Sequence, residues 1–406
     1  MYIKRHIEDT IEKSRNTYPG VLITGPRQVG KSTVLKTTYP DYKYESLDDL
    51  AMLRAISSDP LGYLKICGTP FIIDEIQKAP ELFASLKYII DANKENGLYM
   101  LSGSQKFELM KNVSESLAGR ISVIELLGLS LREINNDAFK MPFIPTEEYL
   151  IKRNPKTTLE LKNIWEIIHR GSMPALYENK DRDWEKYYAN YLSTYVERDV
   201  RSLSQVGDTL SFVQFMTALA ARTGELLNME AIARDVGVSA QTIKRWISIL
   251  EASNIIYLLH PFSLNCTKRI IKMPKVYFTD TGLVCYLCKW LTTDTLINGA
   301  QAGSIFETFV VDEIIKSYIN AGKEPNLYFF RNTDDREIDL IFYQNGTVYP
   351  VEIKKTSSPN IKDIRQFKIL GNYFPGVCIG EGGLICSSES VLPLGEGNKV
   401  IPVNYI

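Results

Sequence analysis

The sequence has almost no net charge, so any attraction to a polyanion has to come from a local patch. Its 406 residues carry 47 Lys and Arg against 48 Asp and Glu, which gives a formal net charge of −1. This balance excludes a uniformly basic surface that would bind nucleic acid or an anionic membrane. A nucleic-acid partner would have to meet a local cluster of basic side chains.

Long apolar runs are also missing. The N-terminal stretch MYIKRHIEDTIEK is charged throughout and lacks the apolar segment of a secretory signal. The apolar run at residues 255–259 is far shorter than the roughly 20 residues that a membrane-spanning helix needs. We therefore expect a cytoplasmic protein without a membrane partner.

Cysteine is scarce, and the six cysteines are expected to be reduced because the chain is large and shows no export signal. Cys285 and Cys288 form a CxxC, which is typical of half a zinc site, of a redox pair, or of two small apolar residues on a buried helix. No second CxxC and no HxxxH lies nearby. The buried helix is therefore the favoured interpretation.

Short strands alternate with helical stretches over residues 21–140, which predicts a doubly wound α/β domain. Most of the strands are continuous apolar runs, as in a parallel sheet that is covered on both faces. The second strand, YKYE, is the weakest of them. The five expected strands are residues 21–24, 42–45, 71–74, 98–102 and 121–126.

A phosphate-binding loop follows the first strand. GPRQVGKST matches G-x-x-x-x-G-K-[ST] and lies between the strand VLIT and the helical stretch STVLKTTY. The glycines let backbone N–H groups point at phosphates, the lysine adds charge at the β- and γ-phosphates, and the serine hydroxyl can ligate Mg²⁺. The motif predicts an ATP site made of Gly25, Pro26, Arg27, Gln28, Val29, Gly30, Lys31, Ser32 and Thr33.

An acidic pair at the end of the third strand supplies the expected partner for Mg²⁺. PFIIDE ends in Asp74 and Glu75. We expect Asp74 to hold Mg²⁺ together with Ser32, and Glu75 to polarise the attacking water. Alone, the pair would also fit an ordinary strand-to-turn transition, but its position after a P-loop favours catalysis.

Three further residues are candidates for the hydrolysis site. The fourth strand ends in LSGS, where Ser102 or Ser104 is suited to reach the γ-phosphate or the water. Arg120 stands just before the fifth strand and could contact a γ-phosphate in its own subunit or in a neighbour of a homo-oligomer. The alternatives are a serine-rich turn and an ion-paired surface arginine.

These motifs, taken in order, resemble a known family. GPRQVGKST, FIIDEIQKAPELF, LSGSQ and SLAGR, followed by RGSMPALY, TYVERDV, YFTDTGL and FETFVVDEI, are similar to prokaryotic ATPases of the AAA superfamily that carry a C-terminal domain of unknown function. The resemblance covers nearly the whole chain. It implies an AAA-type sheet with Glu75 as the catalytic glutamate and Ser102 or Ser104 as the sensing serine, but it defines no biological role.

The middle of the chain predicts a winged helix. In residues 228–262 a first helix, a tight turn at Gly237 and a second helix capped by Ser239 precede the apolar run IIYLLHPF. The segment is nearly charge-neutral, so a structural or protein-contact role stays open beside DNA binding. The candidate DNA contacts are Gln241, Thr242, Lys244 and Arg245 on the second helix, with Lys268, Arg269, Lys272 and Lys275 just beyond it.

The C-terminal part carries carboxylates at the spacing of a metal nuclease. REIDLIFYQNGTVYPVEIKKT predicts two strands and a turn that bring Asp339, Glu352 and Lys354 together, with Glu307 on a preceding helix. Two carboxylates can hold Mg²⁺ or Mn²⁺ and the lysine can activate water. The pattern resembles the PD-(D/E)xK restriction-endonuclease-like fold, although Ile338 stands where proline is usual. Solvated strand ends, or a domain that binds without cutting, are the alternatives.

The sequence therefore predicts a multidomain α/β protein. Its parts are an AAA-type P-loop domain at residues 1–140, a helical lid or connector at 141–207, a winged helix at 208–290 and a nuclease-like domain at 291–406. We expect ATP hydrolysis with Mg²⁺, coupled to a module that engages DNA, with cleavage of the DNA left open. The alternative is an ATP-dependent switch whose other domains only bind a partner.

Overall fold

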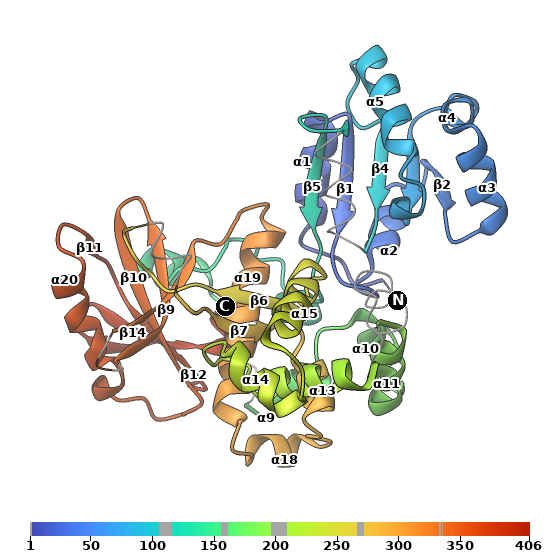
Figure 1. Cartoon of the computed structure of the whole chain (residues 1–406). Coiled ribbons are helices and arrows are strands. Elements are labelled where there is room, and N and C mark those ends of the chain that lie inside the picture. The colour runs from blue at the N-terminus through green and yellow to red at the C-terminus, as the bar shows by residue number, and fades with distance from the viewer. Residues whose placement is uncertain are drawn as a thin grey trace.

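Two β-sheets lie apart, and a mainly helical region connects them (Figure 1). The computed structural model describes residues 2–104, 116–155, 161–195, 209–265, 272–332, 334 and 336–406. The five-stranded sheet belongs to the first third of the chain and the seven-stranded sheet to the last. This division follows the change from apolar strands to helical patterns along the sequence.

The five-stranded sheet confirms the predicted α/β domain. Its strands pair in parallel, in the order β2-β3-β4-β1-β5. Parallel strands place their carboxyl ends at one edge, so the loops after β1, β3 and β4 meet there. The strands are β1 (Gly20–Thr24), β2 (Lys43–Ser46), β3 (Phe71–Asp74), β4 (Tyr99–Ser102) and β5 (Ile121–Glu125).

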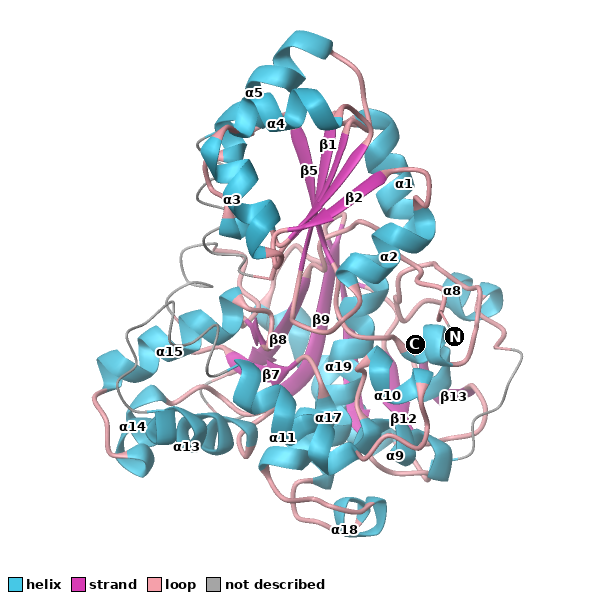
Figure 2. Ribbon diagram, turned by 90° about the vertical axis from the view of Figure 1, so that its right-hand side faces the viewer, coloured by secondary structure: helices cyan, strands magenta, loops and turns pink. Residues whose placement is uncertain are grey.

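Both faces of this sheet are covered by helices, as Figure 2 shows. Strand side chains alternate between faces. Val21 and Ile23 therefore join a core with α1 and α2, whereas Leu22 joins a second core with α5. The helices are α1 (Glu8–Thr17) and α2 (Lys31–Thr38) on one side and α3 (Leu50–Ser58), α4 (Pro60–Cys67) and α5 (Leu82–Asn93) on the other.

Short helices connect the two sheets. The tyrosine-rich stretch predicted as a helix forms α11 (Trp184–Tyr195), and Tyr187, Tyr188, Tyr191 and Tyr195 are buried on it. Spacings of three and four residues place these rings on one side of the helix. The other helices here are α7 (Leu131–Ile134), α8 (Glu147–Lys152), α9 (Leu161–Arg170), α10 (Pro174–Glu178) and α13 (Thr209–Ala220).

A helix-turn-helix and a hairpin follow. The helices α14 (Met229–Val236) and α15 (Ala240–Ala252) are joined at Gly237, whose φ of 75° lies in the left-handed region that glycine favours. The Ser239 side chain caps α15 by accepting from Thr242 N at 3.1 Å. Strands β6 (Ile256–Leu259) and β7 (Lys275–Phe278) then pair antiparallel. The predicted helices, turn and first strand are all present.

The C-terminal region packs a long helix against a mixed sheet. In the predicted hairpin, β9 (Glu337–Gln344) and β10 (Thr347–Lys354) run antiparallel with Leu340 opposite Val351. The long helix is α19 (Ala302–Asn320), preceded by α17 (Thr281–Leu287) and α18 (Thr293–Ile297). The remaining elements are β8 (Leu327–Arg331), η3 (Ile361–Ile369), α20 (Leu370–Tyr373), β11 (Cys378–Ile379), β12 (Gly383–Cys386), β13 (Leu392–Gly395), β14 (Asn398–Pro402) and η4 (Val403–Tyr405).

One apolar cluster runs through all these parts. It includes Ile7 near α1, Trp165 of α9, Phe306 of α19 and Ile406. Continuous burial of this kind makes the regions depend on one another for stability. Over the ranges that the structure describes, no helix combines the length and apolar character that crossing a membrane requires.

Candidate functional site

The loop between β1 and α2 has the backbone of a phosphate-binding loop. Gly25 has a φ of 139°, and a Cβ there would lie 2.0 Å from the Leu126 carbonyl oxygen. Gly30 has a φ of 93° at the start of α2. Both positions require glycine, because one is crowded by a neighbouring strand and both lie in the left-handed region. The loop can therefore turn its N–H groups inward at the end of the parallel sheet.

Lys31 is held inside this loop. Its Nζ donates to the carbonyl oxygens of Gly25 at 3.0 Å and of Pro26 at 2.7 Å. The residue is only 7% exposed. The ammonium group is therefore kept at the centre of the loop, where a phosphate needs a compensating positive charge.

Asp74 is the centre of a hydrogen-bonded group at the carboxyl end of β3. Ser32 Oγ and Tyr44 OH each donate to its Oδ2 at 2.8 Å, and Ser102 Oγ donates to its Oδ1. The strand order β2-β3-β4-β1 explains this convergence, because each partner comes from a neighbouring strand end or from the helix after β1. The predicted pair Ser32 and Asp74 is thus in direct contact, and a hydroxyl and a carboxylate are ligands suited to Mg²⁺.

Glu75 has an unusual backbone conformation, which sets the direction of its side chain. Its φ of 56° is left-handed, which is uncommon for a residue other than glycine and is often found at functional sites. Its Oε1 accepts from Ser104 Oγ at 3.5 Å, and its Oε2 accepts from Gln77 Nε2. The two candidate serines therefore have different partners, since Ser102 contacts Asp74 and Ser104 contacts Glu75.

A cavity of about 420 Å³ lies over this group. One side consists of P-loop residues, including Lys31, together with Glu75 and Ser104. The other side comes from the helical region, which was expected to be a lid or connector, but none of its residues was predicted at this site. It consists of Pro174, Ala175 and Glu178 of α10 and Thr194 of α11. These residues carry no nucleotide motif; RGSMPALY marked the segment only through the family resemblance.

Arg5 is a second residue that the motifs did not reveal. Its guanidinium donates to the carbonyl oxygens of Val29 and Leu127, both at 2.8 Å, and pairs with Glu133 Oε1 at 3.2 Å. Arg5 is buried. It therefore fixes the P-loop to the segment that follows β5, because a buried guanidinium must keep its donors satisfied.

Arg120 lies at the wrong end of the sheet to reach the P-loop of its own chain. It precedes β5, whose first residue pairs with Gly20, while the P-loop follows Thr24 at the other end of β1. Five strand residues span about 13–17 Å. Arg120 instead pairs with Asp91 of α5 at 2.6 Å. The expectation of a contact within its own subunit is wrong for this reason; a contact with a neighbouring subunit stays a prediction.

The exposed face of α15 carries three of the four predicted DNA contacts. Gln241, Lys244 and Arg245 are exposed. Thr242 is half-buried and is engaged in the helix cap with Ser239, at 2.9 Å between the hydroxyl oxygens. The side chains that can reach a partner from this helix are therefore the first three.

The basic segment after the helix-turn-helix is only in part a surface feature. Lys268 and Arg269 lie outside the described residues, and Lys272 is exposed. Lys275 was expected to grip phosphates, and this is wrong. Its side chain is 4% exposed and pairs with Glu307 at 3.0 Å and Glu337 at 2.5 Å, because every residue of β7 is buried.

The C-terminal hairpin brings the predicted acidic residues together. Lys354 Nζ lies 2.7 Å from Glu352 Oε1 and 3.8 Å from Asp339 Oδ2, and the Ile353 N–H donates to Asp339 Oδ2 at 2.8 Å. Glu307 of α19 accepts from Tyr277 OH at 2.6 Å. We call Glu307, Glu337, Asp339 and Glu352 the acidic cluster.

Burial and repulsion between carboxylates favour the neutral forms of Glu307 and Glu352. Burial, and then the Asp339 carboxylate, raise the pKa of Glu352 to about 8 and that of Glu307 to about 6. Burial lowers the pKa of Lys354, but the carboxylates of Asp339 and Glu352 outweigh it and raise that pKa above its ordinary value. Protons and ammonium groups therefore compensate the carboxylates.

The expected second Mg²⁺ or Mn²⁺ in this region is not supported. Within the described part of the chain, no group of three or more His, Cys, Asp or Glu residues is arranged to hold a metal. Lys275 lies among the carboxylates, at a distance where a metal ion would repel its ammonium group. The side chains fit the nuclease-like pattern, but their arrangement does not fit the metal.

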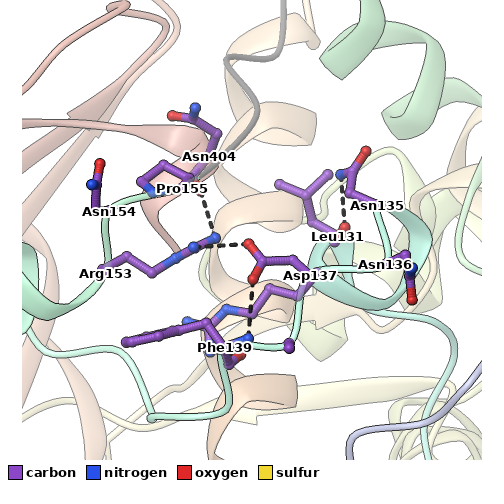
Figure 3. A pocket seen from close by; sticks show the side chains of 11 residues that line it. Leu131, Asn135, Asn136, Asp137, Phe139, Arg153, Asn154, Pro155 and Asn404 are labelled. Carbon is purple, nitrogen blue, oxygen red and sulfur yellow. Dashed lines mark hydrogen bonds and ion pairs between the residues drawn. The ribbon is translucent and has the colours of Figure 1, made fainter.

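Another cavity, of about 350 Å³, lies at the joint between the two halves of the molecule (Figure 3). Its Arg153 pairs with Asp137 at 2.8 Å and donates to the Asn404 carbonyl oxygen at 3.0 Å. Arg132, also in its wall, donates to the carbonyl oxygen of Ile406 at 2.9 Å. These arginines attach residues 404–406 to the helical region, so the cavity wall is a structural joint.

The P-loop, its acidic partner and the parallel sheet are those of an AAA-type ATPase domain. Residues 17–135 match the family model of the AAA domain. Residues 161–294 match a domain of unknown function (DUF8612), and residues 302–406 match another (DUF4143). Neither of the latter two models states an activity.

Two similar proteins over the full length are themselves uncharacterized. They come from Mycobacterium bovis and Mycobacterium tuberculosis, and each is 28% identical over 407 residues, covering 99% of this chain and 84% of the relative. The similarity therefore extends beyond the AAA domain to the whole arrangement of the chain. It supplies no substrate or partner.

Solved structures resemble the chain only loosely. The Walker-type ATPase of Pyrococcus abyssi has a TM-score of 0.44 at 14% identity and covers 70% of this chain and 96% of its own. AMPPCP-bound DnaA from Aquifex aeolicus has a TM-score of 0.30 at 16% identity and covers 60% of this chain and 85% of its own. Scores this low carry no argument about function.

Proposed function

We propose that this chain binds ATP with Mg²⁺ and hydrolyses it at the site formed by the P-loop, Asp74 and Glu75. The observation that carries the proposal is the contact of Ser32 and Ser102 with Asp74, beside Lys31 and Glu75. When bound, Mg²⁺ neutralises charge that develops on the phosphates. The cavity has room for a nucleotide, and its donors and acceptors suit a magnesium phosphate.

The residues divide the work by their chemistry. Lys31 supplies positive charge to the phosphates, and Ser32 with Asp74 would hold the metal. Glu75 Oε1, steadied by Ser104, is placed to accept a proton from water. The wall from α10 and α11 excludes solvent from the far side of the cavity.

The test compares ATP binding and hydrolysis for the wild-type protein and Lys31→Ala. The variant should bind ATP at least about 100-fold more weakly, because a buried charge-assisted contact with phosphate is lost. Lys87→Ala, at an exposed position on α5, is the matched control and should behave as wild type. Equal affinity of Lys31→Ala and wild type would refute the site.

We further propose that α14, α15 and the β6–β7 hairpin form a winged helix that engages DNA through α15. The support is the order of the elements and the exposure of Gln241, Lys244 and Arg245 on one helix. A near-neutral protein needs such a local basic face, since the chain as a whole offers no attraction.

Fluorescence anisotropy of a labelled duplex tests the DNA proposal. Lys244→Glu with Arg245→Glu should weaken binding by at least about tenfold and reduce its salt dependence. Arg182→Glu with Lys186→Glu makes the same charge change on exposed residues of the helical region and should have little effect. If both double variants lost the same amount of DNA affinity, the net charge of the protein, and not the position of the charges, would determine binding.

The second candidate is a switch in which ATP turnover changes conformation and the C-terminal region only binds a partner. Lys275, which pairs with Glu307 and Glu337 in the acidic cluster, favours this candidate over a nuclease. A panel of plasmid, single-stranded DNA and RNA, incubated with Mg²⁺ or Mn²⁺ in the presence and absence of ATP, separates the two. Cleavage that Asp339→Ala abolishes would restore the nuclease candidate.

A further inference from the structure

The acidic cluster is built from three separate parts of the fold. Glu337 and Asp339 lie on β9, Glu352 lies on β10, and Glu307 lies on α19. Glu352 Oε2 is buried and has no hydrogen-bond partner among the residues that the structure describes. A buried carboxylate oxygen without a donor carries a desolvation cost, so this cluster still lacks compensation at one of its oxygens.

Much of the positive charge that compensates these carboxylates comes from a side chain outside the C-terminal sheet. Lys275 belongs to β7, the second strand of the hairpin that follows the helix-turn-helix. Its Nζ contacts Glu307 Oε1 at 3.0 Å and Glu337 Oε1 at 2.5 Å, so a single ammonium joins α19 to β9. Tyr277, two residues further along β7, donates to the same Glu307 oxygen at 2.6 Å. Strand alternation puts both side chains on one face of β7.

These contacts occupy the oxygens that a divalent cation would need. Carboxylate oxygens bind Mg²⁺ or Ca²⁺ at about 2.0–2.6 Å, and a metal bound to Glu307 would lie next to the Lys275 ammonium. Lys354 stands in the same relation to Glu352, at 2.7 Å. Lys354, however, is on the same strand as Glu352, whereas Lys275 comes from the β6–β7 hairpin, which lies outside the C-terminal sheet.

We propose that Lys275 closes the acidic cluster to metal ions. Its ammonium takes the cation position as long as β7 is packed against α19, and the cluster acquires a divalent cation only when this lysine is withdrawn. The contact also holds the β6–β7 hairpin against the C-terminal region. The proposal is independent of ATP hydrolysis and of DNA cleavage, since it concerns only which cation the carboxylates hold.

Mn²⁺ binding, measured by calorimetry without nucleotide, tests the proposal on the full chain. Lys275→Ala and Lys275→Gln should each bind one Mn²⁺ more than wild type, and Glu352→Gln alone should remove no Mn²⁺ from the wild type. Adding Glu352→Gln to Lys275→Ala should abolish the gain. Lys272→Ala changes an exposed lysine three residues away and should match wild type.

Each other result overturns the proposal. It fails if folded Lys275→Ala and Lys275→Gln bind no more Mn²⁺ than wild type, or if wild type already binds a Mn²⁺ that Glu352→Gln removes. If both Lys275 variants are unfolded without metal, their thermal unfolding is measured again in the presence of Mn²⁺. Recovery of folding that depends on Glu352 supports the proposal, and no recovery contradicts it.

Discussion

Ser32 donates a 2.8 Å hydrogen bond to Asp74, which joins the first residues of α2 to the last residue of β3. The two residues are 42 positions apart in the chain, yet each ends or begins an element at the same edge of the sheet. The contact aligns a hydroxyl oxygen and a carboxylate oxygen before any ligand arrives. Such preorganisation lowers the cost of binding a metal.

Asp74→Asn should therefore impair the response to Mg²⁺ more than the binding of ATP. We expect the Mg²⁺ concentration for half-maximal hydrolysis to rise by about 10–100-fold, because the metal would lose a negatively charged ligand. The measurement is ATPase rate against Mg²⁺ concentration. Asp41→Asn, at an exposed position before β2, should leave the curve unchanged.

Glu75→Gln should keep ATP affinity and lose turnover. The amide retains the shape of the side chain but cannot accept a proton from water, so kcat should fall by about 10²–10⁴-fold. Single-turnover hydrolysis and nucleotide binding, measured on the same protein, separate the two effects. The control is Glu81→Gln, on the exposed turn before α5. If Glu75→Gln hydrolysed ATP as fast as that control, Glu75 would be excluded as the base.

Arg120→Ala should reduce hydrolysis, by roughly 10³-fold, only if the residue acts on a neighbouring subunit. Its exposed ion pair with Asp91 contributes little to stability, so the variant should unfold at nearly the wild-type temperature. Mixing Arg120→Ala with Glu75→Gln protein tests the arrangement, because mixed assemblies would contain some complete sites. Without recovery of activity at any mixing ratio, an action between subunits is excluded. Asp91→Asn frees the arginine and should keep full activity.

Asp312 should make stability depend on pH. Burial raises the pKa of this α19 side chain to about 7, although Lys316 opposes the shift, and its Oδ1 has no hydrogen-bond partner within the described part of the chain. The folded state therefore holds its proton more tightly than the unfolded state, whose pKa is near 4. The free energy of unfolding should fall as pH rises from about 4 to 7 and then level off.

Comparison with Asp312→Asn isolates this contribution. The difference in unfolding free energy between the two proteins should change by about 2–4 kcal/mol between pH 4 and pH 8, in favour of the variant at high pH. Urea unfolding at several pH values measures it. Lys316 and Glu313 face Asp312 and stay in place, so a difference that does not vary with pH would mean that Asp312 is charged throughout.

Gly171→Ala should destabilise the protein by about 3 kcal/mol or more. A Cβ there would lie 2.2 Å from the Tyr188 hydroxyl and 2.9 Å from the carboxylate oxygens of Asp280, in a backbone with a φ of 83°. Crowding and the left-handed conformation add their costs. Gly237→Ala has a similar φ of 75° but open space around it, so it should cost only about 1–2 kcal/mol. Thermal unfolding of both variants gives the comparison.

The nucleotide side of the molecule could be predicted from sequence because its signals are local. An apolar run, a glycine-rich turn and an acidic strand end each define one piece, and a parallel sheet brings their ends together. The five strands and the contact between Ser32 and Asp74 follow from that logic. The hairpin that carries Asp339 and Glu352 was predictable for the same reason, from a turn between two short strands.

The parts that could not be predicted depend on contacts between distant segments. Lys275 lies in a basic stretch that suggests phosphate binding, and its actual partner Glu307 is 32 positions away on another element. Ala175 of α10 lines the nucleotide cavity without any motif that refers to a nucleotide. Arg120 is different, because it precedes β5 and a parallel sheet puts it at the edge opposite the P-loop; the sequence order already contained this information. The domain boundaries stay predictions.

The attachment of residues 404–406 to the helical region sets an order for the making of the molecule. Arg153 donates to a carbonyl oxygen that lies 251 positions later in the chain. A ribosome adding about 5–20 residues per second needs roughly 10–50 s to cover that interval. Throughout that time the P-loop domain can already have its strands and its phosphate loop, while Arg153 still lacks this partner. The joint between the two halves can therefore form only after residues 404–406 have been made.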